Sequence, residues 1–367
     1  MLNVYLCSTP FHLLSAAVIR DHREQAEAGG RHVLVYTGGR ALPAWVDSPW
    51  NAVIAPQDDG STPMPGLVNR IAGKQRRKVT LAALAAAAIA REVDETAEAV
   101  NFHFAHLEDY LANHCFFASR FARRASYFVL PDGALNYYRI ATNAKRIPAH
   151  LGKVAQAASA GLTYRPFVGL LSGLDRRRVQ AQFAMSDRVF SSDKAVVVDT
   201  ALWRRRMAGP TALAAGTPDD HGDAVLLIGQ ESEIYHIGFE RYVEIWKELA
   251  AEMGRRHRGP LYYKPHHDWP DPAPIVAEIS TIIPDVRVIA RSERPVEMLI
   301  GEYGIRTVVS VLSSALLHCK LVYGEQIDAV SVSYTKVASR YRWSGVDADL
   351  GGLRQVFEDA GVEMLEL

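Results

Sequence analysis

The sequence predicts an α/β protein with two Rossmann-like domains, and three observations support this class. The chain has 367 residues, which is more than one compact core usually holds and suits two domains. Short apolar runs alternate with longer segments of helical character in both halves, as in doubly wound sheets. A stretch rich in Ala, Gly, Pro, Thr and Asp separates the halves. We therefore expect a first domain at residues 1–207, a linker at 208–223 and a second domain at 224–367 that ends in a terminal helix.

The first half opens with a strand, a helix and a second strand. Residues 2–7 form the apolar run of the first strand, and Thr9 and Pro10 open the helix, because Thr can cap a helix and Pro suits its first turn. The turn between them lacks the GxGxxG pattern, so a dinucleotide site is not expected there. Further strands are expected at 32–36, 51–55, 99–104, 126–130 and 188–191, with helices at 81–90 and 107–120, whereas residues 142–182 are less regular.

The second half repeats this alternation. Strands are expected at 225–228, 261–263, 286–289, 307–312 and 329–332, and helices at 235–253, 275–282, 296–303 and 347–360. In such sheets ligands bind beyond the carboxyl ends of the strands. The residues that follow each strand are therefore the first place to look for a site.

Composition and charge exclude several classes of function. Lys and Arg total 41, as do Asp and Glu, and this neutral balance argues against a nucleic-acid partner. Three distant cysteines without a CxxC pair argue against a disulfide framework or a zinc site, so the reducing cytoplasm is the expected compartment. No signal peptide is expected at the start. The most apolar window, residues 81–90, is shorter than the roughly 20 residues that span a bilayer.

Three polar clusters stand where apolar strands end. Lys264 and His266 follow one strand, and a cation beside an imidazole suits a phosphate and the charge it gains on departure. Ser313 and Ser314 precede a helix, where hydroxyls and the first N–H groups can bind an anion. Asp132 ends a strand of the first half. The alternative readings are a solvated turn, a simple helix cap and a common Asp-Gly turn.

Four short motifs carry a resemblance to a known family. They are the opening residues 6–14, Asp132-Gly133 with Asn136-Tyr137-Tyr138, Lys264-Pro265-His266, and Ser313-Ser314. In this order they resemble the motifs of bacterial GT-B sialyltransferases, especially those that decorate capsules and lipo-oligosaccharides. Two positions depart from the family: Pro131 replaces an acidic residue, and His267 replaces the Pro of a His-Pro pair. The triplet at residues 58–60 is a literal match to the acidic motif, but Asp132 is preferred because it ends a strong apolar strand.

The resemblance implies a GT-B fold, with two Rossmann-like domains facing a central cleft, and an inverting, metal-independent transfer without a cofactor. Sialic acid, or a related nonulosonic acid, would pass from its CMP-activated donor to a glycan hydroxyl. Asp132 would be the general base and His266 the group beside the leaving phosphate, with His267 a second choice. The remaining candidates are Lys264, Ser313, Ser314, Gly229 and Gln230 for the donor, and Thr9, Pro10, Asn136 and Tyr137 on the acceptor side.

Several alternatives stay open at this point. The chain could use a UDP- or GDP-sugar on the same fold, or be an inactive GT-B-like module that binds a glycan or a partner protein. Basic runs at 74–78, 176–178 and 204–206 could face the inner membrane or an anionic acceptor, or be solvated surface. Asp347 and Asp349 spell a metal-binding Asp-x-Asp but more simply begin the last helix. Three histidines, His103, His106 and His114, lack the spacing of a metal site.

Overall fold

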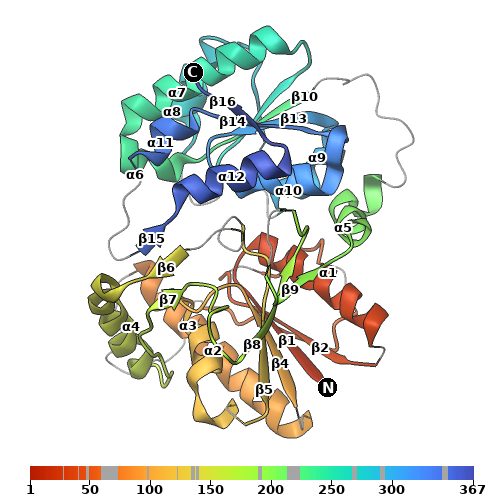
Figure 1. Cartoon of the computed structure of the whole chain (residues 1–367), viewed down its shortest axis with the longest axis vertical. Coiled ribbons are helices and arrows are strands. Elements are labelled where there is room, and N and C mark those ends of the chain that lie inside the picture. Colours follow the sequence, from red (N-terminus) through yellow and green to blue (C-terminus); the bar gives the residue numbers. More distant parts are fainter. Residues whose placement is uncertain are drawn as a thin grey trace. The chain divides into compact units, whose positions relative to one another are not determined.

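The chain forms two compact units (Figure 1). The computed structural model describes residues 1–27, 29–39, 41–46, 49–58, 73–96, 99–121, 123–133, 137, 140–188, 192–212, 224–266, 271–289, 294–340 and 346–367. The first unit comprises Met1–Asp199 and Ser344–Ala348, and the second comprises Thr200–Trp343 and Asp349–Leu367. Each contains a parallel sheet, so the predicted class of two Rossmann-like sheets is confirmed.

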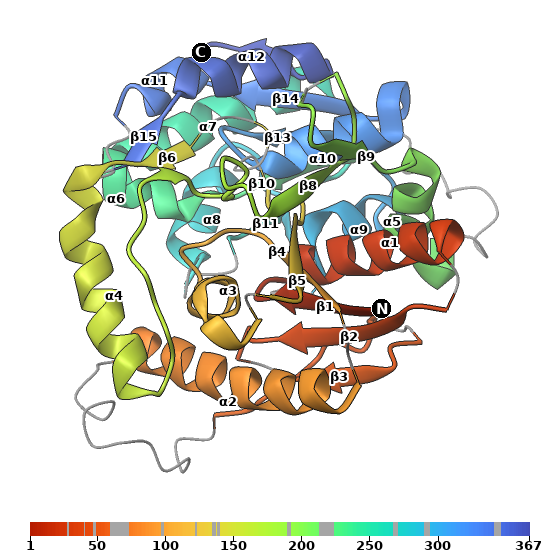
Figure 2. The ribbon, with the colours of Figure 1, turned by 60° about the horizontal axis from the view of Figure 1, so that its bottom comes forward.

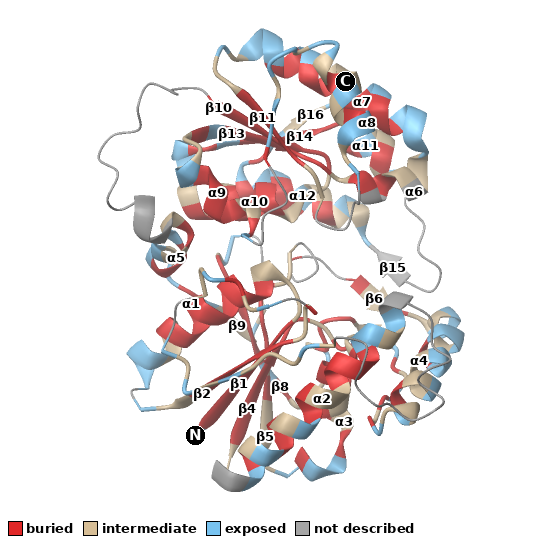
Figure 3. Cartoon of the chain, turned by 180° about the vertical axis from the view of Figure 1, so that it is seen from behind, coloured by how far each residue is buried: buried red, intermediate tan, exposed pale blue. Residues whose placement is uncertain are grey.

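The first unit is built on a seven-stranded parallel sheet of order β3-β2-β1-β4-β5-β8-β9. Its strands are β1 (Leu2–Cys7), β2 (Arg31–Tyr36), β3 (Ala52–Ile54), β4 (Val100–Phe104), β5 (Ala125–Val129), β8 (Val179–Ala184) and β9 (Ala195–Val197). The central strands β1 and β4 are buried along their whole length (Figure 3). Helices cover both faces of the sheet, so even the polar Asn3, Asn101 and His103 of these strands are buried.

Helices α1 (Pro10–Ala26) and α2 (Gly73–Thr96) lie on opposite faces of this sheet (Figure 2). Helix α3 (Tyr110–Phe117) joins α2 in the core on one face. A small antiparallel sheet of order β15-β6-β7 adds β6 (Ile140–Thr142), β7 (Gly169–Leu170) and β15 (Val346–Ala348), next to helix α4 (Ile147–Ser159). Helix α4 and strands β6 to β9 were not predicted from the sequence, and the strand expected at 188–191 falls mostly outside the described residues.

The second unit has a six-stranded parallel sheet of order β12-β11-β10-β13-β14-β16. The strands are β10 (Ala224–Ile228), β11 (Leu261–Lys264), β12 (Arg287–Val288), β13 (Ile305–Ser310), β14 (Asp328–Val332) and β16 (Glu363–Leu365). The helices are α5 (Thr200–Ala212), α6 (Ile234–Ile237), α7 (Phe239–Arg256), α8 (Ala273–Ser280), α9 (Val296–Glu302), α10 (Ser314–Tyr323), α11 (Tyr334–Ala338) and α12 (Leu350–Ala360). Strand β10 therefore lies between β11 and β13, so the residues that follow β10 are next to the turns that follow these two strands.

The division between the units falls before the expected boundary at residue 207. Helix α5 packs against α9 and α10 of the second unit, and its buried Leu202, Trp203 and Met207 supply the apolar face. Part of the expected linker, residues 208–212, is therefore helical, and residues 213–223 lie outside the described part of the chain. The terminal helix begins at Leu350, after β15 has paired with β6 of the first unit.

Candidate active site

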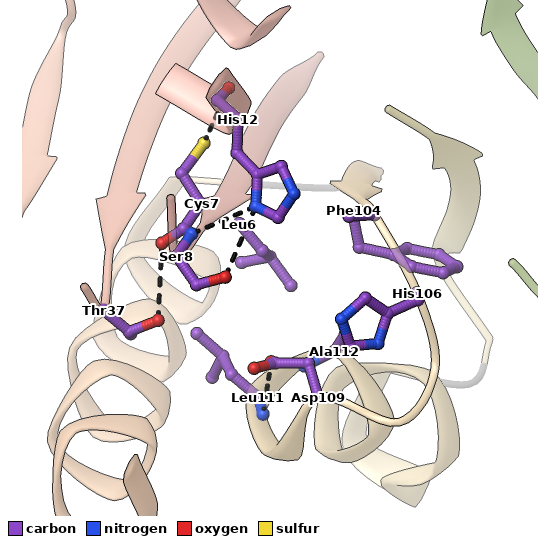
Figure 4. Close-up of a pocket in the computed structure, with 11 residues that line it drawn as sticks. Leu6, Cys7, Ser8, His12, Thr37, Phe104, His106, Asp109, Leu111 and Ala112 are labelled. Atoms are coloured by element: carbon purple, nitrogen blue, oxygen red, sulfur yellow. Dashed lines mark hydrogen bonds between the residues drawn. The ribbon is translucent and has the colours of Figure 1, made fainter. Parts of the chain in front are cut away.

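The carboxyl ends of β1, β2 and β4 meet at one edge of the first sheet and surround a pocket (Figure 4). Its lining comprises Leu6, Cys7, Ser8, His12, Thr37, Phe104, Ala105, His106, Asp109, Leu111 and Ala112. This is the edge where open α/β sheets bind their ligands. The pocket is thus in the place where the sequence analysis expected a functional site in the first domain.

His12 and Asp132 form a hydrogen-bonded pair at this edge. His12 Nε2 lies 2.8 Å from Asp132 Oδ1, and the two side chains are 3% and 18% exposed. The main-chain N–H of Ser8 donates to His12 Nδ1 at 3.3 Å, so Nδ1 accepts and Nε2 carries the proton that is donated to Asp132. The carboxylate is therefore held by a buried imidazole while its own side chain keeps access to solvent.

The first turn of α1 places His12 at this edge. Thr9 caps the helix, because its Oγ1 accepts the main-chain N–H of His12 at 3.2 Å, and Pro10 is the first helical residue. Both were acceptor-side candidates, and both contribute here to the helix start that carries His12. His12 itself was not among the residues predicted for the site, although its place in the first turn of the helix after a buried strand was a usable signal.

The turn that carries Asp132 is fixed by its backbone. Ser15 Oγ of α1 donates to the Pro131 carbonyl at 3.3 Å, and Gly133 has φ of +53°, a conformation that glycine adopts at little cost. Tyr137, a further acceptor-side candidate, is buried in the first unit. Asn136 and Tyr138 lie outside the described residues, as do Asp59 and Gly60 of the competing acidic motif.

The three histidines considered for a metal have separate surroundings. His103 is fully buried and stacks on Tyr5 with ring centroids 4.4 Å apart, and burial lowers its pKa well below the usual value. His114 Nδ1 accepts the Thr163 N–H at 2.9 Å. His106 lines the pocket together with Asp109 (Figure 4). Within the described ranges, no group of three or more His, Cys, Asp or Glu side chains is arranged to hold a metal ion.

Asp109 and Asp349 both act as helix caps. Asp109 Oδ1 accepts the N–H groups of Leu111 and Ala112 at 2.9 and 3.0 Å and so starts α3. Asp349 Oδ1 accepts the Gly352 N–H at 2.9 Å at the start of α12. The simpler reading of the Asp-x-Asp motif is therefore confirmed for Asp349. Acidic side chains in these positions also favour the helix dipole.

The predicted donor residues follow the three central strands of the second sheet. Lys264 ends β11 and is only 5% exposed, so it is not the solvated surface charge that the alternative reading supposed. His266 follows it and is half-buried, whereas His267 lies outside the described residues. Ser313 caps α10, since its Oγ accepts the Ala315 N–H at 3.3 Å, and Ser314 is the first helical residue. A capping hydroxyl still has its own proton to donate to an anion.

Gly229 and Gln230 make contacts within the protein at the end of β10. A Cβ on Gly229 would lie 2.7 Å from Glu231 Oε1, so the glycine makes room for that carboxylate. Gln230 Oε1 accepts the Leu312 N–H at 2.6 Å and the Ser310 hydroxyl at 3.2 Å. Both residues were predicted to contact the donor. The structure shows them tying strand ends together.

Comparisons with known proteins agree with this architecture. Residues 180–330 match the family described as Alpha-2,8-polysialyltransferase (POLYST). No curated protein matches the chain by sequence. The chain is similar to the GT-B domain of a sialyltransferase from Photobacterium damselae, with a TM-score of 0.51, 12% identity, and coverage of 100% of this chain and 99% of that chain.

Two further structures show the same fold. A 2,6-sialyltransferase from a Photobacterium species, solved with CMP and lactose, has a TM-score of 0.52, 13% identity, and coverage of 100% of this chain and 78% of that chain. A UDP-N-acetylglucosamine 2-epimerase from Listeria monocytogenes has a TM-score of 0.51, 10% identity, and coverage of 90% and 79%. These likenesses establish the fold alone, and the family match distinguishes among the chemistries that share it. The chain therefore has the GT-B fold, and the match of residues 180–330 to the polysialyltransferase family indicates a glycosyltransferase that moves sialic acid from a CMP-activated donor to a glycan acceptor.

Proposed function

We propose that this enzyme is an inverting, metal-independent sialyltransferase in which Asp132 is the general base and His266 assists the leaving phosphate. The observation that carries the assignment of the base is the hydrogen bond between His12 and Asp132 at the ligand-binding edge of the first sheet. A general base needs a carboxylate that is fixed in direction and open to the substrate. Asp132 meets both conditions, since it is held by a buried imidazole and is itself partly exposed.

The reaction moves one proton and one glycosyl group. The acceptor oxygen forms a bond to the anomeric carbon of the sialic acid, and its proton passes to the Asp132 carboxylate. The bond between that carbon and the phosphate oxygen breaks on the opposite face, and the electron pair leaves with CMP. Attack from the face opposite the leaving group inverts the anomeric centre. Charge develops on the phosphate as the bond breaks, so groups that stabilise it contribute most in the transition state.

The donor side is assigned to the strand ends of the second sheet. His266 would donate a proton or hydrogen bond to the departing phosphate, and Lys264 would add a cation. Ser313 and Ser314 would bind phosphate oxygens, because their hydroxyls stand beside the first N–H groups of α10. These roles require no metal ion, since a monophosphate leaving group carries less charge than a diphosphate.

The proposed acceptor and location are supported by the family match and by the distribution of charge. We assign as acceptor a glycan that already ends in sialic acid, in a capsule or lipo-oligosaccharide, because the matched family is that of alpha-2,8-polysialyltransferases. A cytoplasmic enzyme in peripheral contact with the inner membrane is supported by three buried free cysteines and by exposed basic residues such as Arg77 and Lys78 in α2. No helix in the described ranges is long and apolar enough to cross a membrane. Neither nucleic acid nor a cofactor is part of the proposal.

The test is release of CMP from CMP-sialic acid by the purified full chain, with and without EDTA and with a panel of sialylated glycans. We expect release that survives EDTA and falls about 10²- to 10⁴-fold in Asp132→Asn, the range typical for loss of a general base. Asp58→Asn is the matched control and should leave the rate unchanged. Turnover of a UDP- or GDP-sugar instead of CMP-sialic acid would overturn the donor assignment, and full activity of Asp132→Asn would overturn the base.

A further inference from the structure

We propose that Gly229, Gln230 and Glu231 form a clamp that positions both donor-binding turns of the second unit. The clamp is the three-residue segment that follows β10. Since β10 lies between β11 and β13, the residues after it are next to the turns that follow both neighbours. The inference rests on the proposed function, because it concerns the turns to which the donor contacts were assigned.

Glu231 holds the turn that carries His266. Its side chain is fully buried, and Oε2 accepts the main-chain N–H of His266 at 2.8 Å. Oε1 accepts the hydroxyl of Tyr263 at 2.5 Å. A carboxylate that is taken out of water needs such partners, and these two hydrogen bonds fix the direction in which each oxygen points. The main chain at His266 is therefore tied to the end of β10 by a charge-assisted hydrogen bond, which is stronger than a bond between neutral groups.

Two buried tyrosines, Tyr263 and Tyr242, complete the contacts of the clamp. Burial, together with the charges of Tyr242 and Glu231, raises the pKa of Tyr263 well above its usual value. The Tyr263 hydroxyl therefore keeps its proton and donates a hydrogen bond to Glu231. Tyr242 accepts the main-chain N–H of Gln230 at 2.9 Å, which anchors the clamp to α7.

Gln230 holds the turn that leads to Ser313. Its Oε1 accepts the Leu312 N–H at 2.6 Å, one residue before the serine that caps α10. The same oxygen lies 3.2 Å from Ser310 Oγ at the end of β13. The amide thus fixes the backbone from which the two candidate phosphate-binding serines project. Gly229 completes the clamp, because any Cβ there would approach both oxygens of the Glu231 carboxylate within 2.8 Å.

A positioning role differs from a purely structural one in what it changes. Loss of a buried glutamate lowers stability wherever the residue lies. Loss of the clamp should also make the turns at His266 and Leu312 less ordered and change the steady-state kinetics with CMP-sialic acid. Glu297 in α9 provides the matched control. It is buried in the same unit, and its Oε1 lies 2.7 Å from His318 Nδ1, outside the donor-binding turns.

The experiment compares hydrogen exchange and steady-state kinetics in the full chain for Glu231→Leu, Glu231→Gln, Gln230→Met and Glu297→Leu. We expect Glu231→Leu to speed exchange of the His266 amide about tenfold or more and to lower kcat, because a hydrogen bond to a charged group is lost. Gln230→Met should speed exchange at Leu312 and raise KM for CMP-sialic acid. Glu231→Gln keeps an oxygen that can accept the His266 N–H, so it should retain most of the activity.

Each outcome decides the proposal. Glu297→Leu should lower Tm while leaving both amides, kcat and donor KM at wild-type values. Unchanged exchange at His266 and Leu312 in the clamp variants would overturn the clamp, and faster exchange with unchanged kinetics would overturn its role in donor binding. A wild-type protein that neither turns over CMP-sialic acid nor binds CMP would refute the proposed function, and the exchange data would then still decide whether the clamp orders the two turns.

Discussion

Replacing His12 by Leu should change both the rate of transfer and its dependence on pH. The variant removes the donor that lies 2.8 Å from Asp132 Oδ1 and fills a buried position with an apolar side chain of similar size. A hydrogen bond to a charged group contributes about 1.5–3 kcal/mol. Since each 1.36 kcal/mol corresponds to a factor of ten, loss of the orientation that this bond gives to the carboxylate should lower kcat/KM by up to about ten- to 150-fold.

The pH profile separates this role from general damage to the fold. A hydrogen bond to the ionised carboxylate favours the ionised form, so its loss makes Asp132 bind a proton more tightly. The acid limb of kcat/KM should therefore move to higher pH in the variant. The assay is CMP release between pH 4.5 and 9 at a temperature where the variant is folded.

A second buried histidine of the first unit supplies the control for this prediction. His150 is 1% exposed and its Nδ1 lies 3.0 Å from the Tyr164 hydroxyl, outside the pocket. His150→Leu should lower stability without moving the acid limb. A folded His12→Leu variant with the wild-type acid limb, or an equal shift of the acid limb in both variants, would refute this role of His12.

Three further predictions concern single groups. Ser313→Gly should weaken CMP binding while costing α10 only a few tenths of a kcal/mol, because glycine also caps helices, and calorimetry with thermal unfolding measures both. Gly229→Ala should destabilise the protein by about 1–3 kcal/mol in urea, as overpacking does, since the new Cβ would meet a carboxylate. Burial raises the pKa of Glu108, but the hydrogen bond from Arg146 and the charge of Lys153 outweigh it and lower that pKa to about 2, from a usual 4.5. The folded state therefore gains stability above pH 4.5 and loses it as the pH falls toward 2. Glu108→Gln should lower the free energy of unfolding by up to about 3 kcal/mol at pH 7 and make it depend less on pH in the acid range. Urea titrations at pH 7 and pH 3 measure both effects.

The parts of the fold that the sequence predicts are those whose local pattern is unambiguous. Strands β1, β10 and β13 are buried almost throughout, and each appears as an apolar run followed by a turn signal. Strand β8 was missed because polar Gln180 and Gln182 interrupt its apolar residues, although Gln182 is buried in the sheet. Helix α5 was assigned partly to a linker because Gly209 and Pro210 resemble a breaker signal. Tertiary packing against α9 and α10 decides such cases.

The candidate site shows the same division between local and long-range information. Asp132, His266 and Ser313 were recognisable because each stands just after a strand. Their partners were not, since His12 lies 120 residues from Asp132 and Glu231 lies 35 residues from His266. These contacts depend on the order of strands in the sheet, which local periodicity does not encode.

Strand order also explains why the clamp belongs to the first strand of the second unit. A residue can bond to two turns only if its own strand lies between the strands that precede them. Of the described strands of this sheet, β10 alone has both β11 and β13 as neighbours. A carboxylate and an amide placed after it can therefore reach His266 on one side and Leu312 on the other. The acidic Glu231 would repel a phosphate if it faced the CMP-sugar. Both of its oxygens instead accept hydrogen bonds from the protein, so the contacts assigned to the CMP-sugar come from neutral and cationic groups.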